Sequence, residues 1–201
     1  MYEKLPISFY ARNNVTEIAR DLLGKVLCTN INGVFTAGII VETEAYCGRN
    51  DKACHSCVHG KTERTKIMFG EPGRAYIYLC YGIHHLFNVV TNVEGLADAV
   101  LIRAIEPLEG IDAILRRRNK KSLSRNAGGG PGIVSSALGI TTKHYGTNLL
   151  ENLIWLENRG ILYDDSEVIA SPRVGVNYAA EDAFLPWRFR VKNNTFTSPA
   201  K

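Results

Sequence analysis

The sequence predicts an α+β fold with a mainly antiparallel β-sheet. Three observations point to it: strand-like segments are numerous, hairpin-type turns join them, and only a few segments show helical periodicity. The chain has 201 residues, 45% of them hydrophobic and 22% charged, as in an ordinary globular protein. This length can bury a core without disulfides or metals, so residues 1–201 are expected to form one domain.

The N-terminal elements are a helix and a β-hairpin. Asn14 begins a sequence that resembles a capping box, and apolar residues then recur at helical spacing up to Gly24, a typical C-terminal cap. Strands are predicted over residues 25–30 and 34–46, because Asn32-Gly33 between them is a strong hairpin signal.

The middle of the chain supplies a polar segment and three further strands. Residues 49–66 are rich in histidine, cysteine and charge and are expected to form an ordered loop. Residues 75–79, 86–92 and 99–105 have strand character and are assigned to the same sheet. A helix is predicted over residues 111–118, where the dipole favours the three arginines at its C-terminus.

Basic residues continue from these arginines into the glycine-rich residues 128–132. Such a bend, before a short helix predicted over residues 133–138, could hold phosphates with basic side chains and helix N–H groups. A flexible surface loop explains the same residues, and both interpretations remain open. The C-terminal third shows strand-like runs at residues 153–156 and 167–170.

Charge and hydropathy narrow the classes of partner. The net charge of +4 permits a polyanionic partner without requiring one. No apolar run approaches the ~20 residues that span a bilayer, and the N-terminus lacks the features of a secretory signal. A cytoplasmic protein that does not bind membranes is therefore expected.

The five cysteines are an odd number with uneven spacing, which indicates reduced thiols rather than a disulfide framework. Cys54 and Cys57 raise the question of a metal, but a zinc site usually needs four ligands with a second pair. The further candidates, Cys47 and His59, lie in the same loop. Unligated thiols beside a functional histidine are favoured, and no metal site is predicted.

The strand over residues 34–46 carries two carboxylates and an aromatic on one face. Residues two apart in a strand share a face, so Glu42, Glu44 and Tyr46 point the same way. Such a face is a poor core and a plausible active site. Either glutamate could be a general base and the other a structural carboxylate paired with an arginine, and the spacing leaves the two equivalent.

Residues 76–82 place tyrosines on both faces of a strand. Tyr76 and Tyr78 share one face, while Tyr81 belongs to the other, beside a glycine at the strand end. Tyrosines at this spacing are typical of core packing, but they also suit a pocket that stacks a base held outside a duplex. With the glutamates and His55, they favour water attack on an electron-poor carbon, including the C1′ of a nucleoside.

A series of short motifs occurs in a fixed order along the chain. They are Glu-Thr-Glu-Ala-Tyr, Ala-Cys-His-Ser, Met-Phe-Gly-Glu-Pro-Gly, Tyr-Ile-Tyr-Leu-Cys-Tyr-Gly, Phe-Asn-Val, Leu-Ile-Arg-Ala-Ile-Glu-Pro-Leu-Glu-Gly, Gly-Pro-Gly, Ala-Leu-Gly-Ile and Arg-Val-Gly-Val. Together they closely resemble the alkyladenine (3-methyladenine) DNA glycosylase family. The resemblance covers about residues 5–190, and although each motif alone is weak, the ordered series is specific.

The resemblance implies how water would be activated. Glu44 would be the general base for the attacking water. Arg103, His55 and the backbone carbonyl near Val176 would help to hold that water. This assignment separates the two glutamates that the spacing leaves equivalent.

The resemblance also implies how the base would be held. Tyr46, His55 and Tyr78 would form the stacking walls of the pocket. Tyr81 would be inserted into the duplex where the damaged nucleotide has left. Asn88 would disfavour purines that carry a 2-amino group.

The family fold is α+β, built around a curved antiparallel sheet that resembles an open barrel. The resemblance implies a monofunctional enzyme of base excision repair that needs no metal or other cofactor. It would act on double-stranded DNA that contains 3-methyladenine, 7-methylguanine or hypoxanthine. A monomer is expected, because one-domain enzymes that flip bases can work alone. Two other classes remain open: a non-catalytic nucleic-acid-binding module and a hydrolase of free nucleosides.

Two positions depart from the family pattern. Thr65 follows Arg64 where the family commonly has Asn, and Ile133 follows Gly-Pro-Gly where the family often has Lys. Arg64, Gly130 and Gly132 are candidates for phosphate contacts, so both departures fall beside them. The catalytic set is intact.

Overall fold

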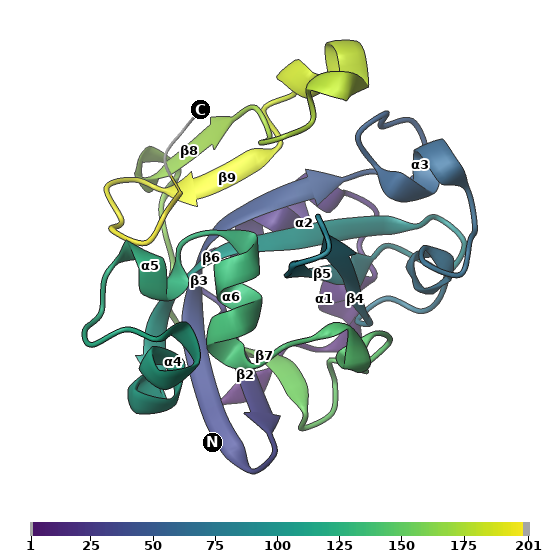
Figure 1. The fold of residues 1–201 in the computed structure, drawn as a ribbon. Coiled ribbons are helices and arrows are strands. Elements are labelled where there is room, and N and C mark those ends of the chain that lie inside the picture. Colours follow the sequence, from purple (N-terminus) through teal and green to yellow (C-terminus); the bar gives the residue numbers. More distant parts are fainter. Residues whose placement is uncertain (1, 199–201) are drawn as a thin grey trace.

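Nine strands form one antiparallel sheet in the computed structural model, which describes residues 2–198. Seven follow the order β1-β7-β2-β3-β6-β5-β4, β9 pairs with the end of β3, and β8 pairs with β9. The strands are β1 (Glu3–Lys4), β2 (Val26–Ile31), β3 (Val34–Tyr46), β4 (Ala75–Cys80), β5 (His84–Thr91), β6 (Asp98–Glu109), β7 (Ile154–Asn158), β8 (Val168–Ser171) and β9 (Arg188–Val191). Figure 1 shows the sheet curling on itself, which confirms the predicted α+β fold with a curved antiparallel sheet.

Helices cover both faces of this sheet. In Figure 1, α6 (Pro131–Leu138) lies in front of β3 and β6, and α2 (Val15–Asp21) lies behind them. The other helices are α1 (Ile7–Tyr10), α3 (His55–His59), α4 (Ile111–Arg118) and α5 (Arg125–Gly128), with 3-10 turns η1 (Lys66–Phe69), η2 (Thr142–His144), η3 (Asp165–Glu167) and η4 (Asn177–Phe184). Across residues 2–198, none of the helices has both the length and the apolar character to cross a membrane.

The long strand β3 positions the candidate site. Its N-terminal half pairs with β2, and its C-terminal end lies between β6 and β9. The register against β6 shifts beside Gly38 and on both sides of Glu42, and such irregularities bend a strand. The second irregularity falls in the part of β3 that carries Glu42 and Glu44.

Local sequence signals account for several element boundaries. The Asn14 side chain caps α2, accepting hydrogen bonds from the N–H groups of Thr16 and Glu17 at 3.1 and 3.3 Å. Asn32 and Gly33 have φ values of 55° and 74°, as the predicted hairpin turn requires. Both signals act within a few residues, which is why the sequence predicts them.

Other boundaries differ from the prediction. The polar segment of residues 49–66 contains the short helix α3, and α5 ends at Gly128, where the glycine-rich residues begin. Helix α6 begins at Pro131, two residues before the predicted start, because the fixed φ of proline suits the first helical position. The sequence does not predict strands β1 and β9, which are too short to show an alternating pattern.

Candidate active site

A cavity of about 490 Å³ opens at the C-terminal end of β3. Its walls come from β3, the start of α3, the β4–β5 hairpin, β6 and residues 174–178. The structure brings together in this lining the predicted residues Tyr46, His55, Arg64, Tyr78, Tyr81, Asn88, Arg103 and Val176. Glu44 is bonded directly to two of the lining side chains.

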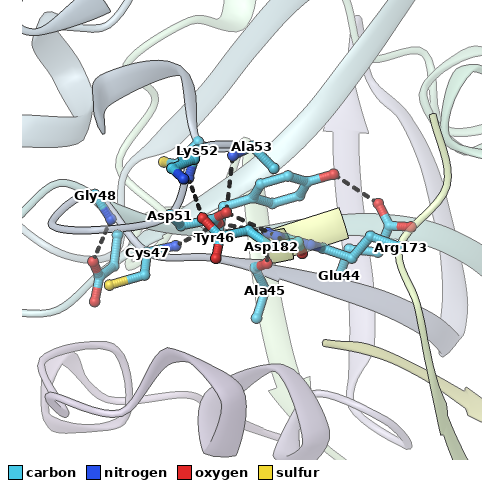
Figure 2. Close-up of polar contacts among 12 residues, drawn as sticks. Glu44, Ala45, Tyr46, Cys47, Gly48, Asp51, Lys52, Ala53, Arg173 and Asp182 are labelled. Atoms are coloured by element: carbon cyan, nitrogen blue, oxygen red, sulfur yellow. Dashed lines mark hydrogen bonds and ion pairs between the residues drawn. The ribbon is translucent and has the colours of Figure 1, made fainter. Parts of the chain in front are cut away.

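Glu44 is fully buried and accepts three hydrogen bonds. Its Oε1 accepts from the Val174 N–H at 2.7 Å. Its Oε2 accepts from the Tyr46 hydroxyl at 2.8 Å, shown in Figure 2, and from Arg103 Nη1 at 3.3 Å. A carboxylate offers about four acceptor positions. One position on Oε1 therefore remains for a further donor, such as a water molecule.

Glu42 is also fully buried, but its acceptor positions are filled by the protein. Arg103 Nε and Arg188 Nε donate to Oε1 at 2.9 and 2.7 Å, and the Ser198 N–H donates to Oε2 at 2.7 Å. The Ser198 hydroxyl also lies within 2.8 Å of both oxygens. Burial raises the pKa of Glu42, but Arg103, Ser198 and Arg188 outweigh it and hold that pKa below the usual value. Glu42 is thus a structural carboxylate.

Arg103 joins the two glutamates. Burial acts to lower its pKa, but the charges of Glu44 and Glu42 outweigh burial and raise that pKa. The guanidinium therefore keeps its charge beside the cavity that it lines. A permanent cation between two buried carboxylates offsets much of the cost of burying them.

Aromatic rings stack along one wall of the cavity. The Tyr76 and Tyr78 centroids lie 5.4 Å apart, and His55 meets the Tyr78 ring edge-on at 4.9 Å. His55 Nδ1 lies 3.0 Å from the Tyr76 hydroxyl. Burial, with the charges of Arg64 and His59, lowers the pKa of His55 to about 4. His55 is therefore neutral at pH 7.

Asn88 is buried on β5, opposite Tyr76 of β4, and lines the cavity. Its Nδ2 donates to the Tyr76 carbonyl at 3.0 Å and to the Leu86 carbonyl at 3.3 Å. Because both acceptors are carbonyls, they fix the orientation of the amide. The group that Asn88 has left for a ligand in the cavity is therefore Oδ1, an acceptor.

Tyr81 stands at the tip of the β4–β5 hairpin and is 89% exposed. Strand β4 ends at Cys80, so the strand alternation that would place Tyr81 opposite Tyr78 does not extend to it. Its direction is set instead by a turn in which Tyr81 and Gly82 have φ values of 51° and 74°. An aromatic residue in this left-handed region is uncommon and strained.

Of the three candidates for phosphate contacts, Arg64 lines the cavity, whereas Gly130 and Gly132 do not. Arg64 lies at the cavity, with its guanidinium 4.5 Å from the centre of the Tyr78 ring. The Gly130 N–H already donates to the Arg103 carbonyl at 2.9 Å. Gly132 lies in the first turn of α6. Thr65 donates to the Gly60 carbonyl at 2.7 Å, so this departure from the family pattern stabilises its own loop.

Two of the basic residues that end α4 bind the fold itself. Arg117 donates to the Thr36 hydroxyl and to the Ala137 carbonyl, each at 3.1 Å. Arg118 donates to the Ser136 hydroxyl at 3.1 Å. These contacts with α6 and β3 give both arginines a structural role.

A buried ion pair of Asp51 and Arg173 lies beside the cavity and is not predicted from the sequence. Arg173 donates to both carboxylate oxygens of Asp51, at 2.5 and 2.8 Å, and both side chains are fully buried. The residues are 122 positions apart, so no local spacing connects them. The only sequence signal is that Arg173 opens the Arg-Val-Gly-Val motif.

The cysteines of the polar loop are free thiols. All five cysteines of the chain are free, and burial raises the pKa of Cys54 to about 11, so its thiol is protonated. In the described part of the chain, no three or more His, Cys, Asp or Glu side chains are grouped so as to hold a metal ion.

Comparison with known proteins assigns the chain to a family. The model of the methylpurine-DNA glycosylase (MPG) family matches residues 8–195. A protein of Alkaliphilus oremlandii named "Putative 3-methyladenine DNA glycosylase" is 42% identical over 202 residues, covering 97% of this chain and 98% of its own. A Bacillus cereus protein of the same name is 42% identical over 201 residues, with 96% and 98% covered. The chain therefore belongs to the methylpurine-DNA glycosylase family, enzymes that hydrolyse N-glycosidic bonds in DNA.

Proposed function

We propose that this protein flips alkylated or deaminated purines out of double-stranded DNA and hydrolyses their N-glycosidic bonds with a water activated by Glu44. The observation that carries the proposal is the arrangement around Glu44. This buried carboxylate is fixed by three donors beside a cavity of about 490 Å³ and keeps one acceptor position. The relatives named for 3-methyladenine support that base as a substrate.

In this mechanism the water donates a proton toward Glu44 as its oxygen attacks C1′ of the damaged nucleotide. The new C1′–O bond replaces the C1′–N bond, and the bonding electron pair leaves with the base. Arg103 and His55 line the same cavity and would help to hold the water. The Val176 carbonyl accepts the Ala179 N–H at 2.9 Å and has a second lone pair for the water.

The charge of the leaving base separates the candidate substrates. The rings of Tyr46 and Tyr78 in the lining would stack on any flat purine. A cationic base such as 3-methyladenine or 7-methylguanine leaves without being protonated. Neutral hypoxanthine is a poorer leaving group, and neutral His55 would not protonate it at pH 7.

Two further residues would select and retain the lesion. Asn88 is held rigidly in the lining by its two hydrogen bonds, so it would disfavour a 2-amino purine by crowding that group. Tyr81, exposed at the hairpin tip beside the cavity, would fill the gap that the flipped nucleotide leaves. One chain supplies all of these residues, which is compatible with a monomer acting on DNA in base excision repair.

A base-release assay on duplex oligonucleotides tests the proposal. Duplexes with one 3-methyladenine or hypoxanthine should lose the base and gain an abasic site, while the matched undamaged duplex should not. Release from free inosine but not from DNA would instead identify a nucleoside hydrolase. Bound zinc at one ion per chain, without abasic sites, would identify a non-catalytic nucleic-acid-binding module.

A further inference from the structure

The buried pair of Asp51 and Arg173 lies at the junction of three walls of the cavity. Figure 2 shows the two side chains among the ends of three segments that are distant in the sequence. Besides its two bonds to Asp51, Arg173 donates to the Ala45 carbonyl at 2.9 Å and to the Asp182 carbonyl at 3.1 Å. One guanidinium thus connects the end of β3, the polar loop and η4.

The same guanidinium lies between two aromatic rings. Its central carbon is 4.8 Å from the centre of the Tyr46 ring and 5.1 Å from that of Trp187. A planar guanidinium stacks on aromatic faces in a way that an ammonium cannot reproduce. Arg173 therefore supports the side of the Tyr46 ring, whose hydroxyl is bonded to Glu44.

The backbone next to Arg173 reaches Glu44 directly. The Val174 N–H donates to Glu44 Oε1 at 2.7 Å, and this is the oxygen with the remaining acceptor position. Fixing Arg173 fixes the start of residues 174–176, which line the cavity. The pair thus helps to position both oxygens of Glu44: Oε1 through the Val174 N–H and Oε2 through the Tyr46 hydroxyl.

Asp51 fixes the backbone of the polar loop by accepting its N–H groups. Its Oδ1 accepts the Ala53 N–H at 2.9 Å, and its Oδ2 accepts the Cys47 N–H at 3.3 Å. The Asp51 carbonyl also accepts the Cys54 N–H at 2.9 Å. These bonds set the start of α3, whose first residue is His55.

We infer that Arg173, held by Asp51, is a positioning residue for hydrolysis of the N-glycosidic bond. It orients Tyr46 and, through the Val174 N–H, the Glu44 carboxylate. The inference rests on the proposed role of Glu44. In this role the Asp51–Arg173 pair, which lies outside the cavity, aligns the Glu44 carboxylate with the attacking water. Misplacing a catalytic group by about 1 Å can cost about 10²-fold in rate, whereas substrate binding depends on many other contacts.

The test compares Arg173→Lys and Asp51→Asn with the wild type. Lysine keeps the charge but loses the fork and the flat stack, and asparagine keeps the shape of Asp51 but loses its charge. Single-turnover base release from a 3-methyladenine or hypoxanthine duplex should fall about 10²-fold in each variant. Affinity for the same duplex should change less than about threefold. Undiminished release in both variants would overturn the inference.

Arg159→Lys is the matched control for a purely structural effect. Arg159 is also a largely buried arginine, bonded to Glu157 at 2.8 Å and stacked 4.4 Å from the centre of the Tyr2 ring. It follows β7, which lies on the opposite side of β3 from the cavity strands β6 and β5. The control should lower the melting temperature about as much as Arg173→Lys while leaving base release unchanged. A comparable loss of release in the control would overturn the inference.

Combining the two substitutions tests whether the pair acts as a unit. The double variant Asp51→Asn/Arg173→Lys should release base no more than about threefold slower than either single variant, because the second change removes an alignment already lost. Rate losses that multiply would contradict a shared role. If one variant does not fold, the other still provides the comparison with Arg159→Lys.

One readout separates this inference from the proposed function. In spectra of protein with labelled tyrosine, the ring signal of Tyr46, identified by its loss in Tyr46→Phe, should broaden or split in Arg173→Lys. Arg159→Lys should leave it unchanged. An unaltered Tyr46 signal in Arg173→Lys would overturn the inference whether or not the wild type releases base. Absence of base release by the wild type would overturn the proposed function alone.

Discussion

Glu42 and Glu44 lie two residues apart on β3, both fully buried and both bonded to Arg103, yet they have different surroundings. Glu42 is saturated by two arginines and by Ser198. Glu44 is held by a tyrosine hydroxyl, an arginine and a backbone N–H, and it keeps one acceptor position beside the cavity. The same residue type is thus saturated by protein donors at one position and keeps an acceptor position beside the cavity at the other.

Glu42→Gln is expected to destabilise the protein strongly. It removes the charge that Arg103 and Arg188 share in a buried site, and breaking a buried pair in this way costs about 3–5 kcal/mol. Chemical denaturation gives the loss of unfolding free energy. Glu71→Gln is the control, because the Glu71 side chain is exposed and a surface pair such as that with Arg74 contributes about 0–1 kcal/mol. Equal losses in the two variants would contradict the structural role of Glu42.

Tyr81→Gly should separate stability from function. Glycine adopts the left-handed φ of 51° without the strain that a tyrosine has there, so the melting temperature should not fall. Affinity for a lesion duplex and the rate of base release should both decrease, because nothing fills the gap in the stack. The measurements are thermal unfolding and duplex titration. If Tyr81→Gly kept the wild-type affinity and rate of base release, Tyr81 would not be the inserted residue.

The low pKa of His55 predicts a pH dependence of stability. Its pKa is about 4 in the folded state and near 6.5 when unperturbed, so between these values the unfolded state binds more protons. The contribution of His55 to stability is therefore present above about pH 6.5 and is lost as the pH falls toward 4. An NMR titration, with His55→Phe to identify the signal, should give a midpoint near 4. A midpoint near 6.5 would contradict a half-buried imidazole that stays neutral.

Asn88→Ala should relax discrimination among purines. The substitution removes the amide whose orientation the Tyr76 and Leu86 carbonyls fix, and it opens space where a 2-amino group would lie. Release of guanine or 7-methylguanine relative to 3-methyladenine should rise. Competition between the two lesions in one reaction measures the ratio directly. An unchanged ratio would show that Asn88 does not select against the 2-amino group.

Much of the fold follows from local signals in the sequence. The cap at Asn14 and the turn at Asn32-Gly33 depend on neighbouring residues, and the structure has both of them. Short elements are different. Strand β9 has four residues and forms because β3 and β8 offer pairing edges, which no local pattern reveals.

The candidate site divides in the same way. The family resemblance places Tyr46, His55 and Tyr78 together, and the structure gathers them around one cavity. The residues that hold this group in place are not predicted, because Arg173 meets Asp51 and Ser198 meets Glu42 only after distant segments have packed. Tyr81 shows a limit of periodicity, since its direction comes from a turn and not from strand alternation.

Single-turnover base release by Glu44→Gln tests the central claim most directly. Glutamine keeps the size of Glu44 but cannot take the proton of the attacking water. With a 3-methyladenine or hypoxanthine duplex at saturating enzyme, the rate should fall about 10²–10⁴-fold while lesion-duplex affinity is retained. Release at the wild-type rate by Glu44→Gln would contradict the assignment of Glu44 as the general base.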